Sequence, residues 1–286
     1  MSRRSPAGRF EPARARTVWS LTETVHSLEP DEERARAIAE EGLILRTTVG
    51  SVVHGLENAG TDDRDEMGVT IEPPEYVLGF KRFEHYVYRT QPEGDPSGPG
   101  DLDLTIYGLK RYCHLALKGA ATVLLPLYVT DGPHLLARTE LGEELQRLAP
   151  AFRSRTAGRA FLGYLDAQRR GLTGERHATR TRELSKRHGY DTKYAMHALR
   201  IGHQGVELLR TGTITLPIPV PERTRLREVR AGEVELDEVL ARLDAVAAEL
   251  EAAADAPGLR ETGDRDAVDR FLVRAYRSGW GDTPEA

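Results

Sequence analysis

The stretch Gly50-Ser51-Val52-Val53-His54-Gly55 follows an apolar segment and precedes two short acidic runs, Asp63-Arg64-Asp65 and Asp101-Leu102-Asp103. Residues 43–49 are apolar and β-branched enough to form a strand, and the Gly-Ser pair predicts where that strand ends. Ser51 stands where the N-cap of a following helix is expected. The sequence therefore predicts a strand, a tight turn and a helix in direct succession.

Two aspartates two positions apart lead into the next predicted strand. This strand is Met67 to Ile71, ended by two prolines, and Asp63 and Asp65 lie at its leading edge. Because alternate side chains of a strand point to one face, both carboxylates are expected on the same face of the sheet. Asp103, or with less support Asp101, is expected to add a third carboxylate from the strand at 102–107.

Three converging carboxylates are typical of a metal site. They repel one another until a cation neutralises them, and Mg²⁺ or Mn²⁺ prefers such oxygen ligands. Asp63, Asp65 and Asp103 are therefore the predicted metal ligands, and Asp103 is also expected to take a proton from an attacking hydroxyl. The backbone N–H groups and hydroxyl of the Gly-Ser turn suit phosphate. The competing interpretation is an acidic turn exposed to water.

The order of predicted elements divides the chain into three parts. Residues 1–28 are rich in Arg, Ser and Pro and predict a flexible N-terminal arm. Residues 29–130 alternate helices and strands, including a strand near 83–90, and predict an α/β (α+β) domain with a small mixed sheet. Residues 131–286 predict a C-terminal helical bundle, because apolar residues recur at spacings of three and four over 137–148, 155–172, 191–209 and 236–254. Between the last two helices, the proline-rich segment 213–221 is expected to be extended.

Composition narrows the class of protein. The 286 residues include 40 basic and 45 acidic side chains, for a net charge of -5, so no overall basic footprint indicates nucleic-acid binding. One cysteine excludes an intrachain disulfide framework and fits a reducing compartment. No apolar run approaches the ~20 residues of a membrane span. We therefore expect a cytoplasmic protein with no membrane partner.

Together these motifs resemble the nucleotidyltransferase fold of the DNA polymerase beta superfamily. Within it they are most similar to the predicted nucleotidyltransferases found near RNA-repair genes and in phages. That family has a GSRAYG-like turn, a DSDxD-like run, an acidic strand leading into a helix, and a downstream GYDTKxAxH-like helix. The corresponding segments of this chain are 50–55, 61–69, 103–112 and 189–197. The last of them is the most specific.

The resemblance implies an enzyme that moves a nucleoside monophosphate from an NTP to a hydroxyl acceptor and releases pyrophosphate, with Mg²⁺ or Mn²⁺ as cofactor. The acceptor is an RNA end, a protein side chain or a small molecule. Lys193, His197 and Arg200 share one face of the downstream helix. That basic face is either solvated or holds the triphosphate. The nucleotide-binding residues that the resemblance implies are Gly50, Ser51, His54, Lys186, Lys193, His197 and Arg200.

Departures from the family pattern keep a second class open. Val52 stands where a basic residue is usual, Glu66 where an apolar residue is common, and Leu125 where a glutamate is expected. Val52 and Leu125 favour a catalytically weakened nucleotidyltransferase-fold protein with a binding or regulatory, antitoxin-like role, whereas the intact set of three aspartates argues against it. A metal-dependent phosphohydrolase ranks lowest, because it needs histidine ligands and only His54 lies near the acids in sequence. The preferred NTP, the acceptor and the oligomeric state remain open.

Overall fold

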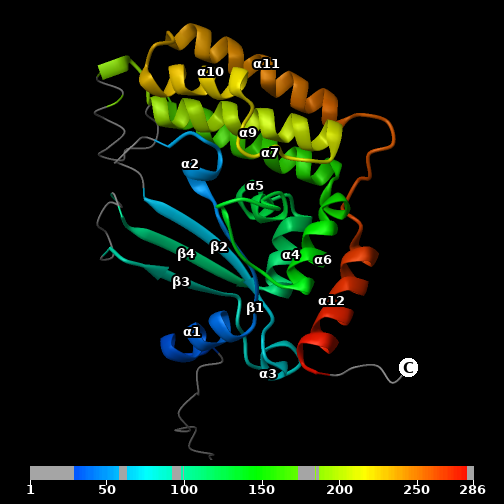
Figure 1. The fold of residues 1–286 in the computed structure, drawn as a ribbon. Coiled ribbons are helices and arrows are strands. Elements are labelled where there is room, and N and C mark those ends of the chain that lie inside the picture. The colour runs from blue at the N-terminus through cyan, green and yellow to red at the C-terminus, as the bar shows by residue number, and fades with distance from the viewer. Residues whose placement is uncertain are drawn as a thin grey trace, which may run out of the picture.

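A five-stranded mixed sheet packs beside a bundle of long helices in the computed structural model (Figure 1). The structure describes residues 29–57, 63–91, 98, 100–172, 184 and 187–281. The predicted arm 1–28 and Lys186 lie outside these ranges. The predicted fold class, a small mixed sheet followed by C-terminal helices, is confirmed.

The sheet has the strand order β3-β4-β2-β1-β5. β2 and β4 are parallel, and the other neighbouring strands are antiparallel. All four strands predicted before residue 130 are present. The five strands are β1 (Leu43–Thr48), β2 (Arg64–Thr70), β3 (His85–Arg89), β4 (Leu102–Gly108) and β5 (Leu135–Arg138).

β5 corrects one helix prediction. Residues 137 and 138 were expected to begin a helix, but they pair with β1 as the edge of the sheet. The helix α6 (Glu140–Arg147) starts only after Thr139, whose hydroxyl accepts a hydrogen bond from the backbone N–H of Gly142 at 3.3 Å. A threonine N-cap fixes this start, because its side chain satisfies an N–H that has no partner within the helix.

Helices cover both faces of the sheet. On one face α1 (Glu32–Glu41) buries Ile38 against apolar residues of β3 and β4, including Tyr86 and Ile106. On the other face, which carries Met67 and Val69 of β2, the larger core forms with the helical layer (Figure 1). The helices and short turns around the sheet are α2 (Gly50–Val53), α3 (Pro74–Val77), α4 (Leu109–Leu117), α5 (Ala121–Leu124), η1 (Leu125–Leu127), η2 (Ala149–Phe152) and α12 (Arg265–Gly279).

The bundle is built around α9 (Thr192–Thr211), which contacts α7 (Arg155–Leu172), α10 (Val220–Ala231) and α11 (Leu236–Ala254). Helices 155–172 and 236–254 are confirmed at both ends. Asp191 is the N-cap of α9, and its carboxylate accepts from Lys193 N at 2.8 Å. α10 was not predicted. Residues 213–221 were expected to be extended, but Val220 and Pro221 form the start of this helix. Pro221 is compatible with a helix here because it lies in the first turn.

The last helix of the chain returns to the sheet. Tyr276 of α12 donates to Glu72 Oε2 at 2.7 Å, and Trp280 Nε1 donates to the Glu72 backbone carbonyl at 2.8 Å. Burial raises the pKa of Glu72, and the Leu109 N–H donates to the same carboxylate. β5 belongs to the sheet and α12 packs beside it, although both follow residue 130. The domain boundary at residue 130 is still a prediction. No helix in the described ranges is long and apolar enough to cross a membrane.

Candidate active site

The three predicted metal ligands lie together at one end of the sheet. Asp65 of β2 is paired in register with Asp103 of the parallel strand β4, and Asp63 directly precedes β2. One carboxylate oxygen from each of the three lies within 4.8 Å of the others, and all three residues are half-buried. The structure therefore brings together the carboxylates that strand alternation places on one face.

The structure separates Asp103 from the alternative, Asp101. Asp101 is used within its own loop, because its two carboxylate oxygens accept from Thr90 Oγ1 and from Gly98 N, each at 2.9 Å. Asp103 instead points to the cluster and is oriented through Oδ1. This oxygen accepts from Gln91 Nε2 at 2.9 Å and pairs with Arg89 Nε at 3.3 Å.

Gly50 brings the Gly-Ser turn directly against the acidic cluster. Its φ is +70°, and a Cβ built on it would stand 1.9 Å from Asp65 Oδ2. Only glycine satisfies both the backbone conformation and the close approach. The helix α2 begins at Gly50 with Val49 as its N-cap, so the expected N-cap role of Ser51 was wrong. The Val49 N–H donates to the Asp65 carbonyl at 2.8 Å and fixes the turn to β2.

His54 is buried behind this turn, with 1% of its surface exposed. Its Nδ1 lies 2.5 Å from the Gly50 carbonyl oxygen, and its Nε2 lies 2.6 Å from Arg200 Nη1. Burial and the Arg200 charge hold the pKa of His54 well below 6.5, so the ring is neutral. Both ring nitrogens are bonded within the protein. This arrangement does not support the predicted contact between His54 and phosphate.

The basic stripe on α9 is less uniform than its spacing suggested. Lys193 is exposed, His197 is partly buried, and Arg200 is buried. Burial, with the neighbouring charges of Arg200 and Lys193, lowers the pKa of His197 to about 3, so it carries no charge at neutral pH. Burial lowers the pKa of Arg200 to about 10, which leaves it protonated. The expectation of three cations is corrected to two, one at the surface and one buried.

With this geometry in view, the sequence matches the RNA repair pathway DNA polymerase beta family, RlaP, over residues 24–274. The chain belongs to the RlaP family. It is therefore a nucleotidyltransferase of the DNA polymerase beta type, as its motifs predicted. No protein of curated function matches the sequence significantly.

Two solved structures are similar to this RlaP-family chain. A nucleotidyltransferase-like protein from Exiguobacterium sibiricum 255-15 aligns at 12% identity over 86% of this chain and 80% of its own, with a TM-score of 0.28. Spectinomycin adenyltransferase AAD(9) from Enterococcus faecialis, solved with ATP and spectinomycin, aligns at 13% identity over 77% of this chain and 96% of its own, with a TM-score of 0.36.

Several residues around the RlaP-family site were not predicted. Gln204 accepts from Arg200 Nη1 at 2.9 Å and follows it by one helical turn, a spacing that the sequence displays. Arg227 donates to the Gly55 carbonyl at 2.7 Å from α10, a helix that the sequence analysis missed. Glu66 is buried on the opposite face from Asp65 and pairs with Arg46 and Arg64 at 2.5 and 2.7 Å. These two arginines explain how a glutamate replaces the apolar residue expected there.

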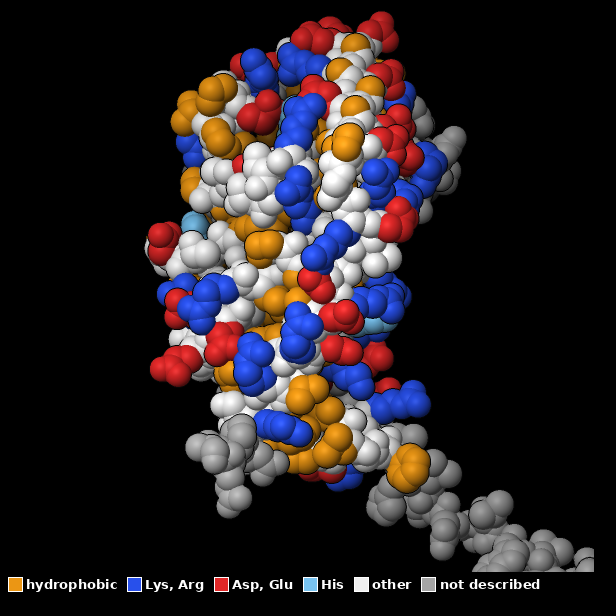
Figure 2. Space-filling model, turned by 90° about the vertical axis from the view of Figure 1, so that its right-hand side faces the viewer, with side chains coloured by type: hydrophobic (Ala, Val, Ile, Leu, Met, Phe, Trp, Pro, Cys, Tyr) orange, Lys and Arg blue, Asp and Glu red, His pale blue; other side chains and the backbone are white. Residues whose placement is uncertain are grey.

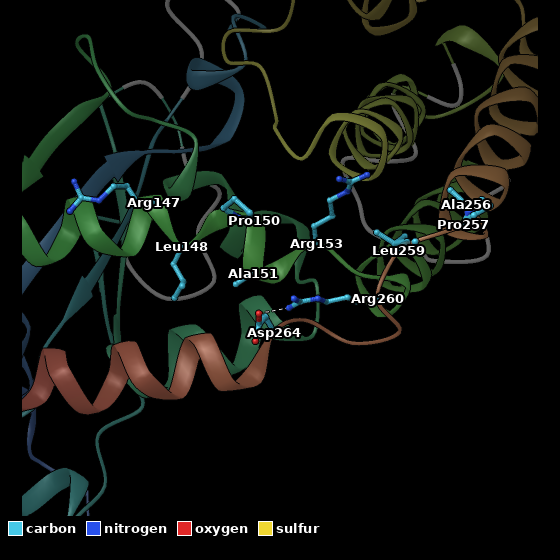
Figure 3. Close-up of a pocket in the computed structure, with 11 residues that line it drawn as sticks. Arg147, Leu148, Pro150, Ala151, Arg153, Ala256, Pro257, Leu259, Arg260 and Asp264 are labelled. Atoms are coloured by element: carbon cyan, nitrogen blue, oxygen red, sulfur yellow. Dashed lines mark ion pairs between the residues drawn. The ribbon is translucent and has the colours of Figure 1, made fainter.

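A hollow of about 620 Å³ lies away from the carboxylates, between α6 and the segment joining α11 to α12 (Figure 3). Three arginines line it, and each has a partner within the protein. Arg260 pairs with Asp264, Arg147 pairs with Glu143, and Arg153 donates to the Leu209 carbonyl. Basic and acidic side chains are interspersed over this side of the molecule (Figure 2). We assign no ligand to this hollow.

Proposed function

We propose that the protein transfers a nucleoside monophosphate from an NTP to a hydroxyl at an RNA end and releases pyrophosphate. The observation that carries this proposal is the cluster of Asp63, Asp65 and Asp103, whose oxygens lie within 4.8 Å of one another beside Gly50. The family's description supports RNA as the acceptor, since it refers to an RNA repair pathway. A protein side chain and a small molecule are the alternative acceptors.

The donor set fits a divalent cation. Asp63, Asp65 and Asp103 offer only carboxylate oxygens, the ligands that Mg²⁺ and Mn²⁺ prefer, and their like charges favour occupation by a cation. Bound there, Mg²⁺ or Mn²⁺ supplies positive charge that offsets the charge of the triphosphate and of the departing pyrophosphate. The three aspartates are the residues that would hold it.

Residues of the protein bind the triphosphate. The backbone N–H groups of Gly50 and Ser51 bind the terminal phosphates next to Asp65. Lys193, exposed on α9, adds a positive charge. The buried Arg200 contributes its charge from within the bundle. Lys186 has the same proposed role and lies outside the described residues.

Asp103 is the proposed base for the transfer. Its carboxylate takes the proton of the acceptor hydroxyl while that oxygen forms a bond to the α-phosphorus. The bond from the α-phosphorus to the bridging oxygen breaks, and pyrophosphate leaves with the electron pair. Gln91 and Arg89 hold the Asp103 carboxylate in one orientation, which removes the entropy cost of aligning the base.

The test uses each α-labelled NTP with Mg²⁺ or Mn²⁺ and RNA substrates that differ only in their end groups. We expect label on RNA and equimolar pyrophosphate with wild type, and neither with Asp63→Ala, Asp65→Ala. The matched control is Asp101→Asn, which alters a nearby aspartate used only within its loop. If wild type labels no acceptor and calorimetry detects no binding of metal and NTP, the proposal fails and the antitoxin-like alternative takes its place.

A further inference from the structure

A buried chain of hydrogen bonds connects the Gly-Ser turn to the helical bundle. It runs from the Gly50 carbonyl to His54 Nδ1 at 2.5 Å, and from His54 Nε2 to Arg200 Nη1 at 2.6 Å. Arg200 Nη1 also donates to Gln204 Oε1 at 2.9 Å. His54 and Arg200 are 1% and 7% exposed, so water does not compete strongly for these contacts.

The hydrogen-bond partners of His54 allow only one protonation state and tautomer of its imidazole ring. A carbonyl oxygen only accepts, so His54 Nδ1 must carry the hydrogen that points to Gly50. A guanidinium only donates, so His54 Nε2 must accept from Arg200. The neutral ring with its proton on Nδ1 satisfies both partners. The lowered pKa of His54, caused first by burial and then by the Arg200 charge, agrees with this state.

This chain of hydrogen bonds fixes the orientation of the Gly50–Ser51 peptide, which faces the proposed phosphate site. The carbonyl of Gly50 and the N–H of Ser51 belong to one planar, trans peptide, so they point in opposite directions. Holding the Gly50 oxygen on His54 therefore directs the Ser51 N–H away from the bundle interior. Gly50 itself does not hold this plane, because glycine at φ +70° has many alternative conformations within reach.

Two further contacts attach the same segment to the bundle side of the molecule. The Ile218 N–H donates to the His54 carbonyl at 3.2 Å, and Arg227 of α10 donates to the Gly55 carbonyl at 2.7 Å. The turn is thus held by β2 through Val49 on one side and by the bundle on the other. Of these bundle contacts, the one through His54 reaches Gly50.

We infer that Arg200 and His54 are positioning residues, which set the Gly50–Ser51 peptide in the orientation that binds phosphate and do not contact the nucleotide themselves. This inference rests on the proposed function, because it takes the Gly-Ser turn as the phosphate-binding element. It assigns the bundle a defined part in catalysis, since α9 controls the geometry of a turn that belongs to the sheet.

The kinetic test compares Arg200→Met with Arg210→Met. Arg210 lies on the same helix but is exposed and pairs with Glu249, so it is the matched control. We expect Arg200→Met to lower kcat/KM for the NTP by about 10- to 100-fold, the range that small misplacement of reacting groups produces. Arg210→Met is expected to stay within about twofold of wild type, and Arg200→Lys to recover part of the loss because an ammonium also donates to Nε2.

A double variant tests whether the two residues act as one link. His54→Asn retains an amide donor near the position of Nδ1 but removes the acceptor for Arg200. We expect the pair His54→Asn, Arg200→Met to be no worse than the more damaging single change, because each breaks the same connection. Additive losses would overturn the inference. So would a lower Tm in Arg200→Met with unchanged kcat/KM, which is what a purely structural role produces.

A spectroscopic test separates this inference from the proposed function. Nitrogen-15 NMR of wild type is expected to show His54 protonated at Nδ1 and unprotonated at Nε2, and Arg200→Met is expected to shift both the ring and the Ser51 amide. A ring protonated at Nε2, or a Ser51 amide that does not respond, contradicts the inference. If wild type binds and transfers no NTP, the proposed function fails, and these spectra still decide whether Arg200 positions the turn.

Discussion

The acidic cluster on the sheet and the basic stripe on α9 were both predicted from residue spacing, but their residues differ in how uniformly they are buried and charged. The carboxylates of Asp63, Asp65 and Asp103 converge within 4.8 Å of one another and all three are half-buried. Lys193, His197 and Arg200 share a helix face but lie at different depths, and His197 is neutral.

The difference lies in what each periodicity determines. A strand period of two fixes which face of the sheet a side chain occupies, and the parallel register of β2 with β4 sets Asp65 beside Asp103. Helical spacing fixes a direction around the axis but not the depth at which the helix is buried. Depth controls charge, because burial disfavours the protonated form of histidine.

The largest effect is expected when one charge is removed from the acidic cluster. We expect Asp65→Asn to lower kcat by about a thousand-fold, or ~4 kcal/mol, because it removes a ligand for the cation that offsets transition-state charge. Without added metal the same variant should unfold at a higher temperature, since one of three repelling charges is gone. Kinetics and thermal unfolding with and without Mn²⁺ measure both effects, and a variant that keeps wild-type kcat contradicts the metal assignment.

A methyl group at Gly50 tests the contact between turn and cluster. Gly50→Ala is expected to reduce kcat/KM by about 100-fold, because the new Cβ meets Asp65 Oδ2 and disfavours φ +70°. Gly132→Ala is the matched control, since Gly132 has φ +75° and no atom lies within 4 Å of the position that its methyl group would take. Equal losses in the two variants would assign the effect to backbone strain and exclude the contact with Asp65.

Acid titration distinguishes the buried part of the stripe from the exposed part. Unfolded histidine has a pKa near 6.5, whereas His54 and His197 are held lower in the fold, so the unfolded state takes up more protons below pH ~6.5. The unfolding free energy should therefore fall as pH drops from 6.5 toward 5, by up to ~1.4 kcal/mol per pH unit for each histidine.

Urea unfolding of His197→Gln at several pH values checks this expectation. The charges that face His197 are Lys193 and Arg200 on α9 and Arg230 on α10, and His54 lies nearby. Removing the titrating ring should reduce the slope by the contribution of one proton. A slope equal to that of wild type would show that His197 binds a proton as readily in the native protein as in the unfolded chain.

The smallest effect is expected at the exposed end of the stripe. Lys193→Met should raise KM for the NTP about two- to fivefold at low salt and less at high salt, because exposed charges are strongly screened. Lys118→Met, an exposed lysine at the end of α4, is the control and should leave KM unchanged. An effect of Lys193→Met that does not change with ionic strength would point to a direct, desolvated contact.

Local patterns predicted the part of the site that lies on or next to the strands. Asp65 and Asp103 lie on strands and Asp63 directly precedes one, but the choice between Asp103 and Asp101 depends on loop contacts that Thr90 and Gly98 make. The link between His54 and Arg200 spans 146 residues, and no local periodicity reports such a distance. The turn motif singled out His54 and helical spacing singled out Arg200, but neither pattern reveals that the two side chains bond to each other.

β5 and α10 were not predicted because their sequence signals are weak, and each has a physical reason. β5 is only four residues long, and its alternating exposure overlaps a pattern that also suits a helix. α10 starts at Val220 with Pro219 as its N-cap and Pro221 as its second residue, which obscures the boundary between extended chain and helix. Their placement depends on tertiary partners, β1 for the strand and α9 for the helix.

The contact between Tyr276 and Glu72 has a consequence for synthesis of the protein on the ribosome. The two residues are 204 positions apart, so at about 5–20 residues per second Glu72 emerges roughly 10–40 s before its partner. During that interval the Glu72 carboxylate lacks the hydroxyl that satisfies it in the finished fold. That side of the sheet is therefore in contact with water until α12 has been synthesised and can pack against it.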